Sequence, residues 1–420
     1  MHKWEKAGWA LATGVFPFTS VQDFEPIRSL ALQDLAAASL RLQLRRKSST
    51  RSVVRIYYGP PGTGKTLTAV RDAVKLADPT FDDKEGPKAA FTRFNELTGQ
   101  VAFVTFHQAL QYEDAIESIR PVVSSNASTD AENDESTERS EVTADGTLKY
   151  RLHEGVILRM IRAAAETPGQ EFVVVIDEIN RGDVSRILGP LISALEPDKR
   201  VGAEFPIGIE LQYPRAETLE SRLFLPANIH FLGTMNSADR NIALVDHALR
   251  RRFEFVEVPP EPSLLRPTKD KQSIDLPRLL TAINARIAHL MGPEYTIGHG
   301  YFMDCGANED VIRVMAQKII PLLREYFYGN PGLMLLVLGE SPATPNNMNV
   351  ITEPNTAFEA IFNLPREIAG GFGYRPHEVG FSLRLDPRFW DGTRVIPGPQ
   401  DQDYAVKAIQ KIYPDTPQSG

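Results

Sequence analysis

The chain has 420 residues, of which 42% are hydrophobic and 24% are charged, and its formal net charge is −8. This composition excludes a wholly disordered chain, a collagen and a coiled-coil rod, and the length predicts two or three domains. One cysteine, Cys305, excludes an internal disulfide and a cysteine zinc cluster. Because the apolar runs are too short to cross a bilayer and the N-terminus lacks the apolar core of a signal peptide, we expect a cytoplasmic protein without membrane contact.

The N-terminal stretch 1–50 is expected to form a tail and one helix. Leucine and isoleucine recur near helical spacing over Asp23–Lys47. The helix ends in the basic cluster Arg45-Arg46-Lys47, which suits the negative end of a helix dipole better than it indicates a DNA contact.

Strands and helices alternate over residues 51–260, which predicts an α/β core with a doubly wound parallel sheet. The expected strands are Val53–Tyr58, Val101–Phe106, Phe172–Ile176 and Ile229–Gly233. The expected helices are Lys65–Ala77, Tyr112–Ile119, Val156–Glu166, Ser185–Glu196 and Ile242–Arg251, and weak alternation over Arg200–Tyr213 predicts a hairpin.

Most of the net negative charge lies in one segment of this core. Residues 124–147 hold seven acidic side chains and one arginine, so the rest of the chain is nearly neutral. The segment is almost free of apolar residues, which predicts a disordered acidic insertion. It is interpreted as a tolerated surface insertion, with repulsion of the DNA backbone from one face or docking of a basic partner as the alternatives. The near-neutral remainder argues against a protein that coats nucleic acid.

The proline-rich run Pro259–Pro262 is the best domain boundary. The pattern after it is helical, over Leu276–Met291 and Val311–Phe327, so residues 261–340 are predicted to form a helical lid. Residues 341–420 are rich in proline and glycine and include the strand-like piece Phe381–Leu385. They predict a short α+β tail.

A phosphate-binding loop lies between the first predicted strand and the first helix of the core. Its residues match G-x-x-x-x-G-K-[ST] and run into the helix at Leu67: Gly59, Pro60, Pro61, Gly62, Thr63, Gly64, Lys65 and Thr66. Glycines let the backbone wrap a phosphate so that amide groups point inward, and the helix N-terminus adds partial positive charge. Lys65 is expected to reach the β- and γ-phosphates, and the Thr66 hydroxyl to ligate Mg²⁺.

Two adjacent acids end the most apolar predicted strand. Asp177 and Glu178 follow Phe172–Ile176, at the carboxyl edge where doubly wound sheets bind ligands. Asp177 is expected to hold Mg²⁺, and Glu178 to orient and deprotonate the attacking water. Two acids with different tasks at one strand end indicate a hydrolysing site and not merely a binding site.

Two further elements complete the predicted site. Asn236 follows the strand Ile229–Gly233, where its amide can hold a water against the γ-phosphate. Three consecutive arginines, Arg250, Arg251 and Arg252, end a predicted helix. A guanidinium on the transition-state charge accelerates phosphoryl transfer by about 10³–10⁵, and a neighbouring subunit can supply it.

Together these elements resemble the AAA+ ATPases, and more specifically the motor subunits of McrBC modification-dependent restriction systems. The resemblance covers roughly Ile56 to Leu338. Its motifs are Asp177–Arg181, Gly233–Arg240, Ala248–Phe253, Val104–Gln108 with Tyr112–Asp114, Ile297–Phe302 and Pro321–Phe327.

The resemblance implies roles for individual residues. Asn236 would sense the γ-phosphate, Arg251 and Arg252 would act in trans as arginine fingers, and Asp239, Arg240 and Arg250 would lie at subunit interfaces. It further implies a homo-oligomeric, hexameric ring that hydrolyses ATP or GTP with Mg²⁺, drives a McrC-like nuclease subunit and acts on DNA through that complex. The nucleotide base and the lid arginine that senses it stay open, with Arg313 and Arg324 as candidates for the latter.

The sequence departs from this family pattern in its N-terminal part. Few residues precede the phosphate loop, so we do not expect this chain itself to carry a domain that reads modified DNA. No nuclease constellation of the PD-(D/E)xK type is found, which assigns cleavage to another polypeptide. The alternative interpretation is a MoxR or dynein-related AAA+ chaperone that remodels a protein complex without DNA.

Overall fold

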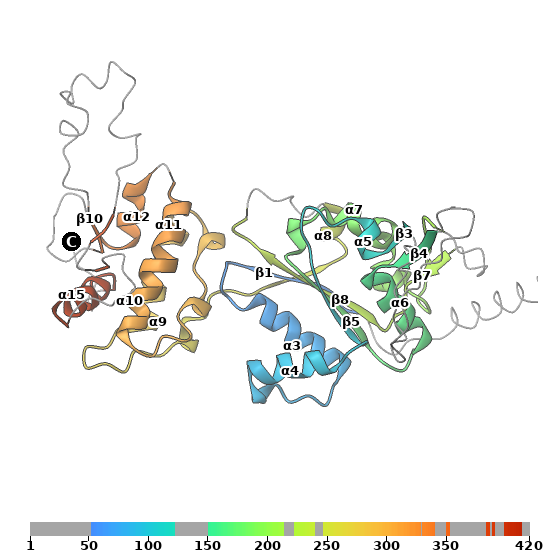
Figure 1. Cartoon of the computed structure of the whole chain (residues 1–420), viewed down its shortest axis with the longest axis horizontal. Coiled ribbons are helices and arrows are strands. Elements are labelled where there is room, and N and C mark those ends of the chain that lie inside the picture. The colour runs from blue at the N-terminus through green and yellow to red at the C-terminus, as the bar shows by residue number, and fades with distance from the viewer. Residues whose placement is uncertain are drawn as a thin grey trace, which may run out of the picture. The chain divides into compact units, whose positions relative to one another are not determined.

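The structure is a computed structural model, which describes residues 52–121, 150–213, 222–239, 247–328, 330–340, 350–352, 384–386, 389–390 and 399–413 (Figure 1). The helix predicted over Asp23–Lys47, the acidic segment 124–147 and Arg240 lie outside the described residues. Among the described helices, none is both long enough and apolar enough to span a membrane.

A five-stranded sheet forms the core of the α/β part. Its order is β2 (Val101–Thr105), β5 (Phe172–Asp177), β8 (Ile229–Asn236), β1 (Val54–Gly59) and β9 (Glu254–Glu257). Strand β5 pairs in parallel with β2 and β8. Its residues 172–176 are all buried, because a strand in the middle of a parallel sheet is covered on both faces.

Strands β8 and β1 run in the same direction. Phe231 N–H donates to the Val53 carbonyl at 2.9 Å, and six residues further along both strands Ser237 N–H donates to the Gly59 carbonyl at 3.0 Å. The carboxyl ends of β5, β8 and β1 therefore belong to one edge of the sheet. That edge is where ligands bind in open α/β sheets.

Of the helices predicted in the α/β part, Lys65–Ala77 and Val156–Glu166 are confirmed, and residues 242–246 of the predicted helix Ile242–Arg251 lie outside the described residues. The helices of this part are α3 (Lys65–Ala77), α4 (Pro87–Glu96), α5 (Tyr112–Ala115), α6 (Val156–Glu166), α7 (Val184–Leu188) and α8 (His247–Arg250). The predicted helix Ser185–Glu196 is wrong beyond Leu188. Gly189 there adopts a φ of 49° and Pro190 follows it, so the chain continues as the 3-10 helix Gly189–Ala194.

Two hairpins depart from the sequence prediction. The predicted helix Tyr112–Ile119 stops at Ala115, and β3 (Glu117–Pro121) pairs antiparallel with β4 (Tyr150–Glu154). Pro121 cannot donate a backbone hydrogen bond and disfavours a helix there. In the second hairpin, β6 (Gly208–Glu210) pairs with β7 (Arg222–Phe224), so the partner strand lies beyond the predicted range Arg200–Tyr213.

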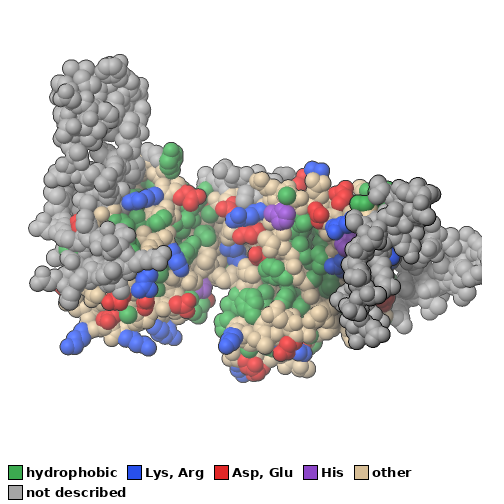
Figure 2. Space-filling model, in the orientation of Figure 1, with side chains coloured by type: hydrophobic (Ala, Val, Ile, Leu, Met, Phe, Trp, Pro, Cys, Tyr) green, Lys and Arg blue, Asp and Glu red, His purple; other side chains and the backbone are tan. Residues whose placement is uncertain are grey.

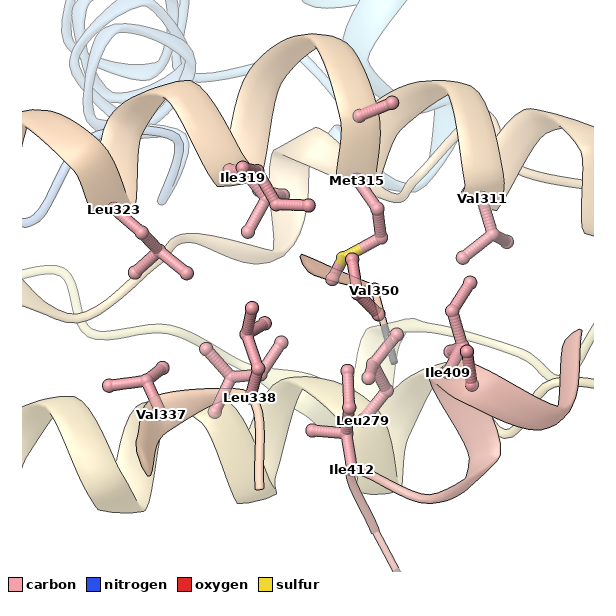
Figure 3. Packing of buried hydrophobic residues seen from close by; sticks show 14 of the residues in the cluster. Leu279, Val311, Met315, Ile319, Leu323, Val337, Leu338, Val350, Ile409 and Ile412 are labelled. Atoms are coloured by element: carbon pink, nitrogen blue, oxygen red, sulfur yellow. The ribbon is translucent and has the colours of Figure 1, made fainter. Parts of the chain in front are cut away.

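Helices follow the sheet in the second half of the chain, as predicted. They are α9 (Leu276–Leu290), α10 (Asn308–Val314), the π-helical turn Met315–Ile319, α11 (Ile320–Tyr326), α12 (Pro331–Val337) and α15 (Pro399–Gln410). The short strands β10 (Ile351–Thr352) and β11 (Arg384–Leu385) pair antiparallel. Figure 3 shows Val311, Met315, Ile319 and Leu323 along one helical run, facing apolar side chains of α9, α12 and α15 across a common core.

The chain divides into two compact units that draw on separate stretches of sequence. One contains residues 70–233 and 243–254, and the other contains 56–69, 234–242 and 255–420. The phosphate loop and the end of β8 thus belong to the same unit as the helical lid. The domain limits at 260 and 340 stay predictions.

On the face drawn in Figure 2, Lys and Arg side chains are interspersed with Asp and Glu.

Candidate functional site

The phosphate loop occupies the turn between β1 and α3, where the sequence predicts it. Strand β1 ends at Gly59 and helix α3 begins at Lys65. Gly62, with a φ of 78°, adopts the left-handed conformation that residues with a side chain rarely reach. The turn therefore depends on glycine at this position, and it leads directly into a helix N-terminus, a ready site for an anion.

Lys65 is directed onto the backbone of its own loop. Its side chain is buried, and Nζ donates to the Pro60 carbonyl at 2.7 Å. The same carbonyl accepts a hydrogen bond from the Thr63 hydroxyl at 3.1 Å. The ammonium group thus contacts the backbone of the loop, and a phosphate oxygen would be a stronger partner for this cation than a carbonyl.

The two predicted carboxylates stand at the end of β5. Asp177 is the last residue of the strand. Glu178 has a φ of 53° and a ψ of 45°, and among the described residues it alone combines a side chain with positive φ. Such a conformation costs on the order of 1 kcal/mol, and it turns the chain sharply into the 3-10 helix Ile179–Arg181.

A guanidinium group holds the Glu178 carboxylate. Arg181 Nε lies 3.1 Å from Glu178 Oε2, and half of the Arg181 side chain is exposed. In the sequence, Arg181 is distinguished only as the last residue of the motif Asp177–Arg181. Side chains three residues apart lie on the same side of a 3-10 turn. The spacing of Glu178 and Arg181 could therefore have suggested the ion pair.

Asn236 ends β8, as its place after the predicted strand required. The strand runs three residues further than Gly233, where the prediction stopped. The next residue, Ser237, joins the ladder to Gly59 at the first position of the phosphate loop. The β8–β1 pairing therefore brings the predicted γ-phosphate sensor to the beginning of the loop.

The three arginines differ in their surroundings. Arg250 and Arg251 are exposed at the end of α8, whereas Arg252 Nε pairs with Glu196 Oε1 at 3.1 Å. Asp239, a predicted interface residue, is half-buried. The structure thus separates Arg252, which is engaged within its own chain, from the exposed Arg251.

The donor set suits magnesium bound together with a nucleotide. The part of the chain that the structure describes holds no cluster of three or more His, Cys, Asp or Glu side chains that could enclose a metal. Thr66 and Asp177 offer one hydroxyl and one carboxylate. Mg²⁺ typically takes few protein oxygens and completes its shell with water and substrate phosphates, so the chemistry of these two groups suits it, and the site itself stays a prediction.

Several contacts between the phosphate loop and the lid were not predicted from the sequence. Gly298 and Gly300 of the lid donate backbone hydrogen bonds to Pro61 and Gly62 of the phosphate loop, and the Ser237 hydroxyl donates to the Glu294 carbonyl. Backbone contacts between distant segments leave no pattern of residue types. The only signal was that Ile297–Phe302 belongs to a motif shared with the resembled family.

Two protein-family models match the chain. The model described as an AAA domain of the dynein-related subfamily matches residues 56–253, and the model described as the McrB alpha-helical lid domain matches residues 275–334. The two matches follow one another along the chain in the order of the observed sheet and helices.

Two curated proteins are similar in sequence. The chain is 30% identical over 318 residues to the Type IV methyl-directed restriction enzyme EcoKMcrB subunit of Escherichia coli (strain K12), covering 72% of this chain and 60% of that protein. It is 27% identical over 238 residues to the Type II restriction enzyme BsuMI component YdiS of Bacillus subtilis (strain 168), covering 53% of this chain and 64% of that protein. The chain thus spans less than two thirds of each relative.

A crystal structure of a candidate ATPase from Cytophaga hutchinsonii aligns with a TM-score of 0.25. It is 12% identical in sequence, and the alignment covers 66% of this chain and 58% of that one. This likeness is too low to carry an argument about the site.

Proposed function

Because the chain is a McrB-like AAA+ protein, with an α/β nucleotide-binding core and a McrB-type helical lid, we propose that it is the NTP-hydrolysing subunit of a DNA restriction complex. The observation that carries the proposal is the set of residues at the carboxyl edge of one sheet. The phosphate loop follows β1, Asp177 and Glu178 close β5, and Asn236 closes β8.

In this proposal the phosphate loop Gly59–Leu67 binds the triphosphate of ATP or GTP. Lys65 exchanges the Pro60 carbonyl for phosphate oxygens, and its charge compensates theirs. Thr66 and Asp177 would hold Mg²⁺, which would neutralise charge on the phosphates.

Glu178 and Asn236 act on water. Glu178 is the general base that accepts a proton from the attacking water, and the Asn236 amide orients that water against the γ-phosphate. The Arg181 ion pair sets the position of the Glu178 carboxylate before nucleotide arrives. The strained backbone at Glu178 supports this role, because such strain concentrates at functional sites.

Arg251 and Arg252 remain the candidates for fingers that reach a neighbouring protomer. The exposure of Arg251 supports it as the group that acts in trans, whereas Arg252 would first have to leave Glu196. Asp239, Arg240 and Arg250 are proposed interface residues around that boundary.

The proposed assembly is a hexameric ring in the cytoplasm that passes mechanical work to a McrC-like nuclease subunit acting on DNA. The names of both curated relatives, each a restriction component, support the restriction system. The McrB lid model supports it over the alternative of a MoxR or dynein-related chaperone. The AAA domain model is described as dynein-related, which is compatible with the restriction subunit and with the chaperone.

Replacing Glu178 with Gln tests the proposed chemistry. We expect Glu178→Gln to lower the rate of phosphate release from ATP or GTP by about 10²–10⁴, because the amide cannot accept the proton. Affinity for a fluorescent nucleotide is expected to stay within about threefold, since the phosphate loop is unchanged.

The matched control is Glu166→Gln, an exposed residue at the end of α6, which is expected to leave both values unchanged. Full hydrolysis by Glu178→Gln would remove Glu178 from the mechanism. Absence of nucleotide binding by the wild-type protein would overturn the proposed function itself.

A further inference from the structure

The lid contacts the phosphate loop through backbone groups. Gly298 N–H donates to the Pro61 carbonyl at 3.0 Å, and Gly300 N–H donates to the Gly62 carbonyl at 2.8 Å. The two segments lie more than two hundred residues apart in sequence yet belong to the same compact unit. A pair of hydrogen bonds to successive carbonyls fixes the orientation of both peptide groups.

This contact is close enough to require glycine on the lid side. A Cβ atom on Gly298 would lie 2.0 Å from the carbonyl carbon of Gly62 and 2.5 Å from the nitrogen of Thr63. A Cβ atom on Gly300 would lie 2.7 Å from the Gly62 oxygen. The atoms nearest to both added Cβ atoms are backbone atoms of the phosphate loop. Space for either Cβ could therefore arise only if the backbone of the loop or of the lid turn moved.

The geometry of the peptide group links the lid contact to the direction of the N–H groups in the phosphate loop. In a trans peptide the C=O and the following N–H point in opposite directions. Because the lid turn holds the Pro61 and Gly62 carbonyls toward itself, the N–H groups of Gly62 and Thr63 are turned away from the lid. Phosphate-binding loops act through such backbone N–H groups, so their direction determines the grip on an anion.

The turn is itself attached to the lid. Asn284 of α9 donates from Nδ2 to the Ile297 carbonyl at 2.8 Å and accepts from Ile297 N–H at 2.7 Å. Ile297 and Phe302, which flank the contact, are buried in the apolar core of the lid. The turn is therefore anchored to α9.

Side chains reinforce the same contact. The Tyr301 ring packs so closely over Gly62 that a Cβ there would lie 2.8 Å from it. At the first residue of the loop, Ser237 donates from its backbone to the Gly59 carbonyl, and its hydroxyl donates to the Glu294 carbonyl of the lid. The phosphate loop is thus tied to the lid at its first residue and at its middle.

We propose that the lid turn Ile297–Phe302 is a positioning element for the triphosphate, in which Gly298 and Gly300 set the direction of the phosphate-loop amides. The proposal rests on the proposed function, because it concerns the same nucleotide. It adds that the lid turn, which is not part of the phosphate loop, determines how tightly the loop binds phosphate. By linkage, nucleotide bound in the loop stabilises the lid turn to the same extent.

The test substitutes the lid glycine in the full chain. We expect Gly298→Ala to weaken binding of ATP and GTP by at least about tenfold, roughly what loss of one or two hydrogen bonds to the loop corresponds to. Hydrogen–deuterium exchange in the nucleotide-free protein is expected to accelerate at Gly62–Leu67 and to stay unchanged in α9. A merely structural role of Gly298 would accelerate exchange in the lid helices too.

A second variant and a matched control complete the test. Asn284→Ala leaves every residue at the loop intact and is expected to weaken binding in the same direction. Gly306→Ala alters a glycine of the same unit that has no neighbour within 4 Å of the added Cβ, and it is expected to behave as wild type.

Two outcomes would count against the proposals separately. Unchanged nucleotide affinity and loop exchange in a folded Gly298→Ala protein would overturn the role of the lid turn and leave the proposed function standing. Failure of the wild-type protein to bind either nucleotide would overturn the proposed function. If Gly298→Ala fails to fold, Asn284→Ala decides: wild-type affinity in that variant would overturn the role of the turn.

Discussion

Arg200 shows how a single charged side chain organises the α/β part away from the nucleotide site. It is fully buried, and its guanidinium donates to the carbonyls of Leu195, Pro226 and Ile229 at 3.0 to 3.3 Å. The Phe231 ring lies 5.7 Å from it. Burial lowers the pKa of Arg200 to about 9, because desolvation disfavours the charged form. These hydrogen bonds offset the cost of desolvating the charge by satisfying three carbonyls, one at Leu195 and two in the stretch 226–229.

Replacing Arg200 with Met is expected to lower the free energy of unfolding by about 2–4 kcal/mol. Methionine fills much of the volume but leaves buried carbonyls without a donor, and each lost hydrogen bond of this kind costs about 1–3 kcal/mol. Urea denaturation followed by circular dichroism measures the change. The exposed Arg186, replaced in the same way, is expected to stay within about 0.5 kcal/mol of wild type. Equal stability of both variants would show that the carbonyls find other donors.

The sequence predicted where the candidate site residues lie along the strands and helices, but it did not predict the side chains that support the surrounding backbone. Lys65, Asp177 and Asn236 occupy the strand and helix ends that their motifs required. Their motifs combine residue type with spacing, which a sequence displays directly. Arg200 and Asn284 act on backbone carbonyls or amides of distant segments, and no residue pattern records such partners.

At the scale of elements, a histidine in the lid turn links two loops in a pH-dependent way. His299 Nδ1 accepts a hydrogen bond from Glu261 N–H at 3.1 Å. Burial lowers the pKa of His299, and the negative charge of Glu261 opposes this shift in part. The folded protein therefore binds fewer protons than the unfolded chain in the range where histidine titrates.

We expect this contribution to stability to be complete at pH values above the ordinary histidine range and to be lost as the pH falls through it. Protonated Nδ1 cannot accept the Glu261 hydrogen bond. His299→Asn keeps an acceptor and does not titrate, so its stability should fall less between pH 7 and pH 5 than that of wild type. Urea denaturation at both pH values compares them. A steeper fall in the variant would reverse the assigned direction.

The predicted elements succeeded where periodicity was undisturbed. Helices α3 and α6 have the predicted limits, and α9 differs by one residue at its end. The prediction was wrong where short elements follow one another, as at Glu117–Pro121. The helix predicted over Val311–Phe327 is present but contains the π-helical turn Met315–Ile319 just before Pro321, where the missing N–H disturbs the regular ladder.

At the scale of the whole molecule, the proposed ring depends on nucleotide held between subunits. We expect the mass measured by light scattering to rise to that of an oligomer when ATP or GTP is added with Mg²⁺. Lys65→Ala should abolish this rise, because the variant cannot hold the triphosphate. The control Lys75→Ala changes an exposed lysine at the end of α3 and should assemble normally. A nucleotide-independent monomer would contradict the ring.

The β3–β4 hairpin has a practical consequence for work on this protein. Pro121 and Tyr150 are paired across the ladder, so the chain leaves and re-enters the fold at neighbouring points. Neighbouring anchor points allow the intervening stretch to be exchanged at little entropic cost, since loop closure depends only weakly on length. The position therefore suits grafting of a fluorescent reporter or an affinity handle without altering the sheet.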